Sequence, residues 1–164
     1  MKPSASNNPA AKAQESCLRL LKVRDRSEKE IRSRLLQRKF SKNIIDETIR
    51  YLKSSRLIDD RQFARNWIQA RLNKPYGLKR INFELKQKGI SDDLAKEELS
   101  RAVSTYHEEE VVLSLIKGRA SRYKTLDPLK RKQRLFSYLM QRGFNADISN
   151  DGISKYFNTD ETNG

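Results

Sequence analysis

The same short segment occurs three times along this chain, beginning at residues 31, 81 and 135. Each copy has two apolar residues four positions apart, then a basic residue, then Lys or Gly, and then another apolar residue. The equivalent positions are Ile31, Leu35, Lys39 and Phe40 in the first copy, Ile81, Leu85, Gly89 and Ile90 in the second, and Leu135, Leu139, Gly143 and Phe144 in the third. The copies are separated by 50 and then 54 residues. A period of this size predicts an array of small units, and it favours recognition along a surface over catalysis in one buried pocket.

Helical spacing accounts for the apolar pattern throughout the chain. Hydrophobic residues make up 36% of the chain and charged residues 34%, so each unit can have only a small core. Gly and Pro are few, and no stretch alternates as a half-buried strand would. The stripes within each unit separate into three short amphipathic helices. The sequence therefore predicts an all-α fold, a tandem array of three three-helix-bundle repeats.

The domain boundaries follow from the repeat and from the composition of the two ends. The first residues are rich in Ser, Asn, Ala and Pro, and the last residues are polar, so we expect both ends to lie outside the bundles. We predict a disordered lead at 1–13, repeats at 14–56, 57–105 and 106–157, and a flexible tail at 158–164.

Several residues indicate where these helices begin and end. Ser27 and Glu30 have the spacing of a capping box. Further helix starts are predicted at Ser41, Asp59, Ser91 and Asp127. Gly89 and Gly143 follow a helix and precede an apolar residue, which is typical of a left-handed C-terminal cap. Lys39 occupies the same place in the first repeat, where a side chain costs about 1 kcal/mol.

The net charge of +14 is unevenly distributed. Residues 1–75 contain 19 Lys and Arg against 8 Asp and Glu, residues 76–110 contain 6 against 8, and residues 111–164 contain 10 against 5. Two basic ends thus flank a nearly neutral middle. This excess indicates a polyanionic partner or an acidic protein surface. Solubility alone is the alternative explanation, although it requires far less charge.

The sequence offers little support for an enzyme or a membrane protein. Cys17 is the only cysteine and lies in an apolar helical stretch, so we expect a buried structural thiol, and no cysteine-based zinc site is available. His107 is the only histidine, and we expect it at a solvated helix start. No Gly-rich phosphate loop and no paired nucleophile and base are present. We therefore expect no catalysis and no cofactor. No apolar run has transmembrane length and no signal peptide is evident, so we expect a soluble, cytoplasmic protein.

Three stretches resemble one known family. They are RSEKEIRSRL at residues 26–35, LIDDRQFA at 57–64, and GLKRI with ELKQKGI between residues 77 and 90. In this order they resemble the bacterial RecX family, the regulatory proteins of the RecA recombinase. The resemblance covers roughly residues 15–157 and is strongest over the first two repeats. Most of the matching residues are expected to be caps and core residues, so they identify the family better than they identify its contact surface.

The resemblance implies an elongated all-helical array that binds RecA and the RecA–single-stranded DNA filament. Such proteins lie in the helical groove of the filament and limit filament extension, ATP hydrolysis and strand exchange. This activity would place the chain in recombination, DNA repair and the SOS response, as a monomer without a cofactor.

Candidate contacts with RecA or DNA must come from cations that the bundles do not need. Lys79 and Arg80 fall in the first turn of their helix, where positive charge opposes the helix dipole. The other candidates lie on non-apolar helix faces or in adjoining turns. The full set is Lys29, Arg32, Arg34, Arg38, Lys79, Arg80, Arg122, Lys124, Lys130, Arg131 and Arg134. An ordinary solvated helix face is the alternative for each cluster.

Two functions remain open at this point. A modulator of RecA needs several modest contacts on one chain. A basic helical module that binds nucleic acid without RecA is also compatible with the charge, since phosphate contacts alone give sequence-independent affinity. Weak direct DNA binding is compatible with both functions, and the sequence does not decide between them.

Overall fold

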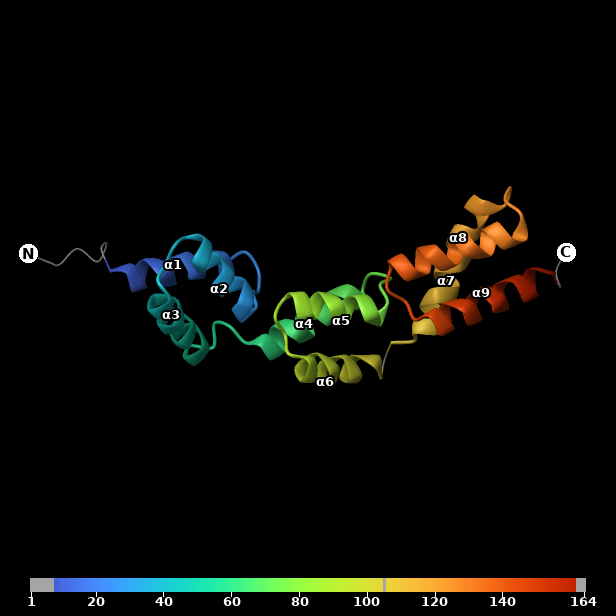
Figure 1. The fold of residues 1–164 in the computed structure, drawn as a ribbon. Coiled ribbons are helices and arrows are strands. Elements are labelled where there is room, and N and C mark those ends of the chain that lie inside the picture. The colour runs from blue at the N-terminus through green and yellow to red at the C-terminus, as the bar shows by residue number, and fades with distance from the viewer. Residues whose placement is uncertain (1–7, 105, 162–164) are drawn as a thin grey trace, which may run out of the picture. The chain divides into compact units, whose positions relative to one another are not determined.

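The computed structural model describes residues 8–104 and 106–161, which form nine α-helices and one short 3₁₀ helix and no β-strand (Figure 1). The first repeat contains α1 (Pro9–Leu21), α2 (Glu28–Gln37) and α3 (Lys42–Ser54). The second repeat contains α4 (Asp60–Leu72), α5 (Leu78–Gln87) and α6 (Asp92–Val103). The third repeat contains α7 (Glu108–Ala120), the 3₁₀ helix η1 (Ser121–Tyr123), α8 (Pro128–Gln141) and α9 (Ala146–Glu161). The all-α prediction, with three helices per repeat, is confirmed.

Contacts between residues divide the chain into two compact units. The first unit runs to Trp67 and also includes Leu85–Ala95. The second unit consists of Ile68–Glu84 and the residues from Lys96 onwards. Each unit therefore contains one complete outer repeat together with part of the middle repeat.

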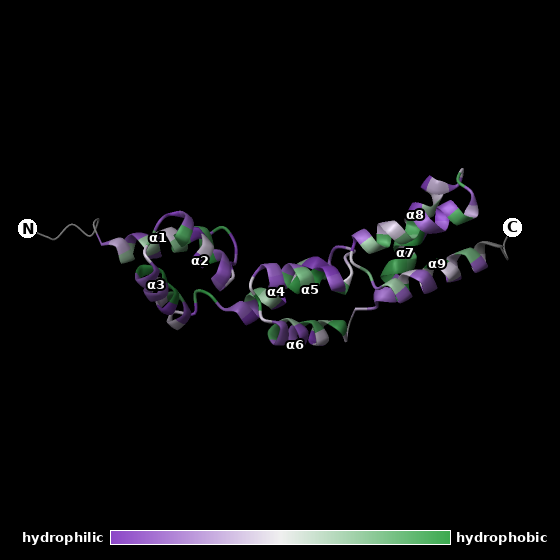
Figure 2. Cartoon of the chain, in the orientation of Figure 1, coloured by the Kyte–Doolittle hydropathy of each residue, from purple (hydrophilic) through white to green (hydrophobic). Residues whose placement is uncertain are grey.

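The core of the first repeat is formed by one face of each of its three helices. Cys17 of α1, Ile31 and Leu35 of α2, and Ile49 and Leu52 of α3 are buried in one cluster. Burial raises the pKa of the Cys17 thiol to about 11, so this residue is a small apolar core residue rather than a thiolate nucleophile. Figure 2 shows that each of these helices carries both hydrophobic and hydrophilic residues, as amphipathic helices do.

The core of the third repeat has the same plan. Val112 and Ile116 of α7 pack with Leu135 and Leu139 of α8. Two aromatic residues complete the cluster: Phe144 from the turn after α8, and Phe157 from α9.

The repeated segment buries the same positions in all three copies. Its two apolar positions have no exposed surface in any copy: Ile31, Leu35, Ile81, Leu85, Leu135 and Leu139. The residue midway between these two positions is exposed in each copy: Ser33, Phe83 and Ser137. The Phe83 side chain is 60% exposed. The apolar pair at i and i+4 thus builds the bundle.

Most of the helix starts predicted from the sequence have the expected capping hydrogen bonds. Ser27 and Glu30 form the predicted capping box. Hydroxyl or carboxylate oxygens of three further starts accept main-chain N–H groups: Asp59, Ser91 and Asp127. Ser41 occupies its predicted N-cap position, but its side chain makes no capping hydrogen bond.

The left-handed turns after the second helix of each repeat are also confirmed. Gly89 and Gly143 have φ of 83° and 80°, and Lys39 has φ of 61° at the equivalent place. Arg56, just after α3, has φ of 53°, and no feature of the sequence predicted it.

Four expectations need correction. The helical part begins at Pro9 rather than near residue 14, because Asn8 accepts the amide of Ala10 and Pro9 occupies the first helical turn. The last helix continues to Glu161, whereas we expected a flexible tail from residue 158. Helical spacing also predicts Leu36 and Val23 on the apolar stripes of their helices, yet their side chains are 60% and 78% exposed. The rest of the predicted lead and tail, residues 1–7 and 162–164, lies outside the described residues.

Candidate interaction surface

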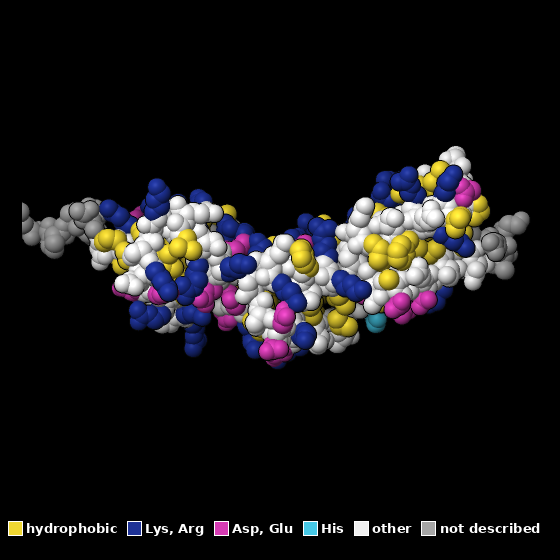
Figure 3. Space-filling model, viewed as in Figure 1, with side chains coloured by type: hydrophobic (Ala, Val, Ile, Leu, Met, Phe, Trp, Pro, Cys, Tyr) yellow, Lys and Arg dark blue, Asp and Glu magenta, His cyan; other side chains and the backbone are white. Residues whose placement is uncertain are grey.

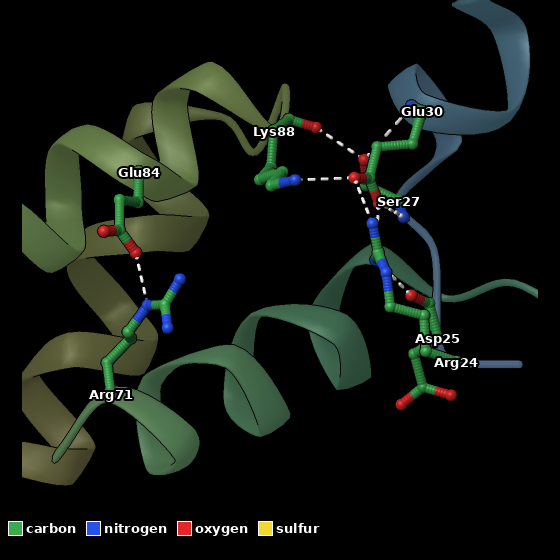
Figure 4. A network of polar contacts seen from close by, with 7 residues as sticks. All are labelled: Arg24, Asp25, Ser27, Glu30, Arg71, Glu84 and Lys88. Carbon is green, nitrogen blue, oxygen red and sulfur yellow. Dashed lines mark hydrogen bonds and ion pairs between the residues drawn. The ribbon is translucent and has the colours of Figure 1, made fainter. Parts of the chain in front are cut away.

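In the first unit, the start of α2 is held by two helix ends of the middle repeat. The Ser27 hydroxyl donates to the backbone carbonyl of Lys88 over 2.6 Å (Figure 4). The Glu28 amide, one of the unsatisfied donors of the helix start, donates to the Asp60 carboxylate over 2.8 Å. We call these contacts the first joint.

An ion-pair network covers the first joint (Figure 4). Glu30 accepts from the Arg24 guanidinium at 2.8 Å and from the Lys88 ammonium at 2.6 Å. Burial would raise the pKa of Glu30, but these two charge-assisted bonds outweigh it and lower the pKa to about 2. The Lys88 ammonium also lies 4.9 Å from the centre of the Trp67 ring. Glu30 and Lys88 are therefore committed to the fold.

In the second unit, the start of α5 is held in a similar way by the third repeat. The Gly77 amide donates to the carbonyl of Arg142 over 2.9 Å. The Leu78 amide donates to the Glu108 carboxylate over 3.1 Å. The Arg142 guanidinium donates to the carbonyl of Pro75 over 2.9 Å. We call these contacts the second joint.

The two joints connect equivalent positions of successive repeats: Ser27 and Gly77, Lys88 and Arg142, Asp60 and Glu108. In both joints a left-handed glycine lies against the second helix of the preceding repeat, Gly89 against Lys29 and Gly143 against Arg80. Burial raises the pKa of both capping acids. Repeats of this size are marginal alone. Through these joints, the first and second repeats are each stabilised by helix ends of the repeat that follows.

Three candidate cations of the first two repeats are held by bonds to acidic side chains or to other helices. Arg32 bridges Glu28 at 2.8 Å and Asp46 at 2.6 Å. Arg38 donates to the Ser16 hydroxyl over 2.6 Å.

Arg80 is the third of these cations. It pairs with Glu84 at 3.1 Å, donates to the Gln141 carbonyl at 3.3 Å, and lies 4.4 Å from the centre of the Tyr76 ring. Glu84 in turn accepts from Arg71 over 2.5 Å (Figure 4). The positive charge of Arg80 near the start of α5 is thus explained by the second joint, without a partner protein.

Other candidates on α2 and α5 remain available to a partner. Lys29 and Arg34 are exposed, and no acidic side chain in the described part of the chain forms an ion pair with either of them. The Arg34 guanidinium donates only to the neighbouring Gln37 side chain, at 3.3 Å. Lys79 is exposed near Glu108. Figure 3 shows many Lys and Arg side chains on the surface of the first repeat.

The candidates of the third repeat lie on η1, on the turn after it, and on α8. Arg122, Lys124 and Arg134 are exposed, and Lys130 is 3.5 Å from its own helix cap, Asp127. Arg131 instead lies over the Phe157 ring at 5.0 Å and is partly buried. Lys132, which the sequence did not single out, lies 5.1 Å from the same ring.

The acids of the joints are the important residues that sequence reasoning missed. Asp60 and Glu108 are expected at helix starts, but each caps a different helix from its own. The only signal in the sequence is that both stand at the beginning of the first helix of a repeat. Within residues 8–104 and 106–161, no group of acidic, His and Cys side chains is suited to hold a metal ion, and no helix is long and apolar enough to cross a membrane.

Comparison with known families matches each repeat to a different domain of one family. Models of the first, second and third three-helix domains of RecX match residues 13–52, 59–99 and 107–151. The matches occur in the same order as the repeats and together cover most of the chain.

Curated relatives and solved structures agree with this assignment. Regulatory protein RecX of Chlorobium phaeobacteroides is 37% identical over 147 residues, which cover 89% of this chain and 94% of the relative. The protein of the same name from Prosthecochloris aestuarii is 32% identical over 145 residues, covering 86% and 91%. The crystal structure of RecX from Lactobacillus salivarius has a TM-score of 0.78 at 25% identity, covering 90% of this chain and 96% of that one. This chain therefore belongs to the RecX family of regulatory proteins.

Proposed function

We propose that this chain binds RecA and the RecA–single-stranded DNA filament in its helical groove, and that it limits filament extension, ATP hydrolysis and strand exchange. Family membership carries the proposal, since all three RecX domains are present in order. The protein would act in the cytoplasm as a monomer, through binding alone and without chemistry of its own.

The distribution of its cations supports a mechanism of several modest contacts. Three basic sites, one per repeat, remain outside the joints: Lys29 with Arg34, Lys79, and Lys130 with Arg134. Contacts of this kind on one chain add their effects, because each contact raises the effective concentration of the next. The targets are acidic surfaces of RecA or phosphates of the bound strand.

The test is the ATPase activity of RecA on single-stranded DNA, titrated with this protein at several salt concentrations. We expect inhibition at a ratio well below one chain per RecA subunit, because blocking extension or spanning several subunits requires few molecules. Inhibition that appears only at one chain per subunit, or not at all, would count against the proposal.

Charge-reversal variants should spare the cations that hold the fold. Lys29→Glu with Arg34→Glu removes the basic site of the first repeat and leaves Arg32 in its ion pairs. Arg50→Glu is the matched control, since Arg50 is exposed on the first repeat and was not a candidate. We expect the double variant to inhibit RecA less than the control does. Equal inhibition by both would exclude Lys29 and Arg34 from the contact surface.

Direct binding to nucleic acid without RecA is the second candidate function, and the uncompensated cations of α2 favour it. The two functions differ in their salt dependence. Binding to naked DNA should weaken log-linearly with salt. Inhibition of RecA should persist at salt concentrations that release the chain from naked DNA.

A further inference from the structure

A pocket of about 490 Å³ opens on the first unit, between the end of α1, the outer face of α2 and the end of α5. Four cationic side chains line it, Arg26, Lys29, Arg34 and Lys88, against one acid, Glu30. Only two of these cations were singled out from the sequence. The pocket lies beside the first joint, whose Glu30–Lys88 pair is drawn in Figure 4.

Arg26 has an unmet hydrogen-bonding requirement in this pocket. Its side chain is partly buried, and its Nε atom is shielded from solvent without a hydrogen-bond partner anywhere in the described residues. Buried polar atoms of native proteins are nearly always paired, and a guanidinium nitrogen can only donate. The Arg26 guanidinium therefore has no acceptor within the described residues, and its terminal nitrogens, which are donors only, bind a negatively charged acceptor best.

The charge of the lining points in the same direction. Glu30 is already neutralised by Arg24 and Lys88. The positive charges of Arg26, Lys29 and Arg34 therefore remain without compensation in the pocket. Hydroxyl and amide groups add donors or acceptors to the lining: Ser33, Gln37 and Gln87.

The composition of the lining favours a phosphate over a peptide that docks as a helix or a strand. Leu20 is the only aliphatic residue among the lining side chains. A docked peptide helix or strand needs several apolar anchors, which this pocket does not offer. Phosphate groups of nucleic acids are instead held by Arg, Lys, Ser and Gln side chains, the types that are present here.

We infer that this pocket is a phosphate-binding site that takes one phosphate of a nucleic-acid strand, with Arg26 as its central donor. The inference rests on the contact with nucleic acid considered under the proposed function, and it deepens that function by naming the site and the chemical group that the site takes. Within the filament complex, the site would hold the first repeat on a nucleic-acid strand.

The test is fluorescence anisotropy of a 3′-labelled 20-mer of dT with the full chain and no RecA. Arg26→Gln removes one charge and the guanidinium donors, and Arg34→Gln removes an exposed cation of the same pocket. The matched control is Arg50→Gln, which removes the same charge from the same unit outside the pocket. Because the Nε atom of Arg26 has no hydrogen-bond partner among the described residues, thermal melts of Arg26→Gln should match those of the parent chain.

We expect Arg26→Gln to weaken binding about tenfold, the value of one charge-assisted hydrogen bond. The slope of log affinity against log salt should fall by about 0.7 for each lost phosphate contact. Arg34→Gln should weaken binding in the same direction, and Arg50→Gln should change it less than about twofold. Equal losses for Arg26→Gln and Arg50→Gln would overturn the inference, because the net charge alone would then explain binding.

Two further arms identify the source of the phosphate and exclude a peptide ligand. Oligonucleotides with a 5′-hydroxyl and with a 5′-phosphate should bind equally if the site takes a backbone phosphate, and the phosphorylated form should bind more tightly if it takes a terminal one. A 20-residue poly-glutamate should compete poorly. Competition by poly-glutamate as strong as that by unlabelled oligonucleotide would overturn the assignment to phosphate.

Discussion

Replacing Gly77 by alanine should destabilise the chain, because the second joint leaves no room for a methyl group. A Cβ at this position would lie 2.2 Å from the carbonyl oxygen of Gly143 and 2.3 Å from the amide nitrogen of Phe144. Both are backbone atoms, so no side-chain rotation can relieve the overlap. The backbone of Gly77 itself is not left-handed, so the whole cost arises at the joint.

The magnitude follows from three effects. Separation of the joint loses the hydrogen bond from Gly77 to Arg142, which is worth about 1 kcal/mol. Forcing a methyl group into a packed contact costs about 1–3 kcal/mol. Alanine returns about 0.4–1 kcal/mol by restricting the unfolded chain. We therefore expect a net loss of about 1–3.5 kcal/mol. It should be measured as a lower midpoint of urea denaturation, followed by circular dichroism, at an unchanged slope.

Gly118→Ala provides the control, since a Cβ at Gly118 would meet no atom within 4 Å and the residue lies within α7. This variant should be more stable than the parent by up to about 1 kcal/mol, the helix propensity difference. If Gly77→Ala were as stable as the parent, or gained stability as Gly118→Ala does, the second joint would not exist as described.

Three further predictions concern the first unit. Lys39→Gly should leave the melting temperature unchanged or raise it, because relief of the left-handed strain, about 1 kcal/mol, offsets the greater freedom of glycine in the unfolded chain. The ion pairs of Glu30 should stabilise the fold at neutral pH. This stabilisation should disappear as the pH falls from the ordinary pKa of a glutamate, 4.5, towards the pKa of Glu30 in the folded chain, about 2. The urea midpoint of Glu30→Gln should therefore depend less on pH over that range than the midpoint of the parent chain does. Asp60→Asn should retain most of the stability because the amide oxygen can still accept from Glu28, whereas Asp60→Ala should lose about 1–2 kcal/mol in calorimetry.

Local sequence predicts the repeats because their determinants lie within one or two turns of a helix. The pair Ile31 and Leu35 marks a buried face, and Ser27 with Glu30 marks a helix start, from spacing alone. Leu36 shows the limit of such spacing, because it stands five residues after Ile31 and therefore lies well off the buried face.

The joints could not be predicted in the same way. Ser27 and Lys88 are 61 residues apart, and no local pattern distinguishes a cap that serves its own helix from one that also binds another repeat. The same limit applies to the cations. Arg32 and Lys29 look alike in sequence, but only the structure shows that acids on α2 and α3 hold Arg32 while Lys29 stays exposed. Arg26 stands out in the sequence only as the first residue of a family motif, since nothing in the sequence indicates its shielded Nε atom.

The most direct test of the proposed function is co-sedimentation of the chain with preformed RecA–single-stranded DNA filaments. The salt concentration is set just above the value at which the chain is released from naked single-stranded DNA. We predict that the chain sediments with the filaments under these conditions. A chain that stays in the supernatant with filaments, while it still binds naked DNA at lower salt, would contradict regulation through RecA and would favour a nucleic-acid-binding protein.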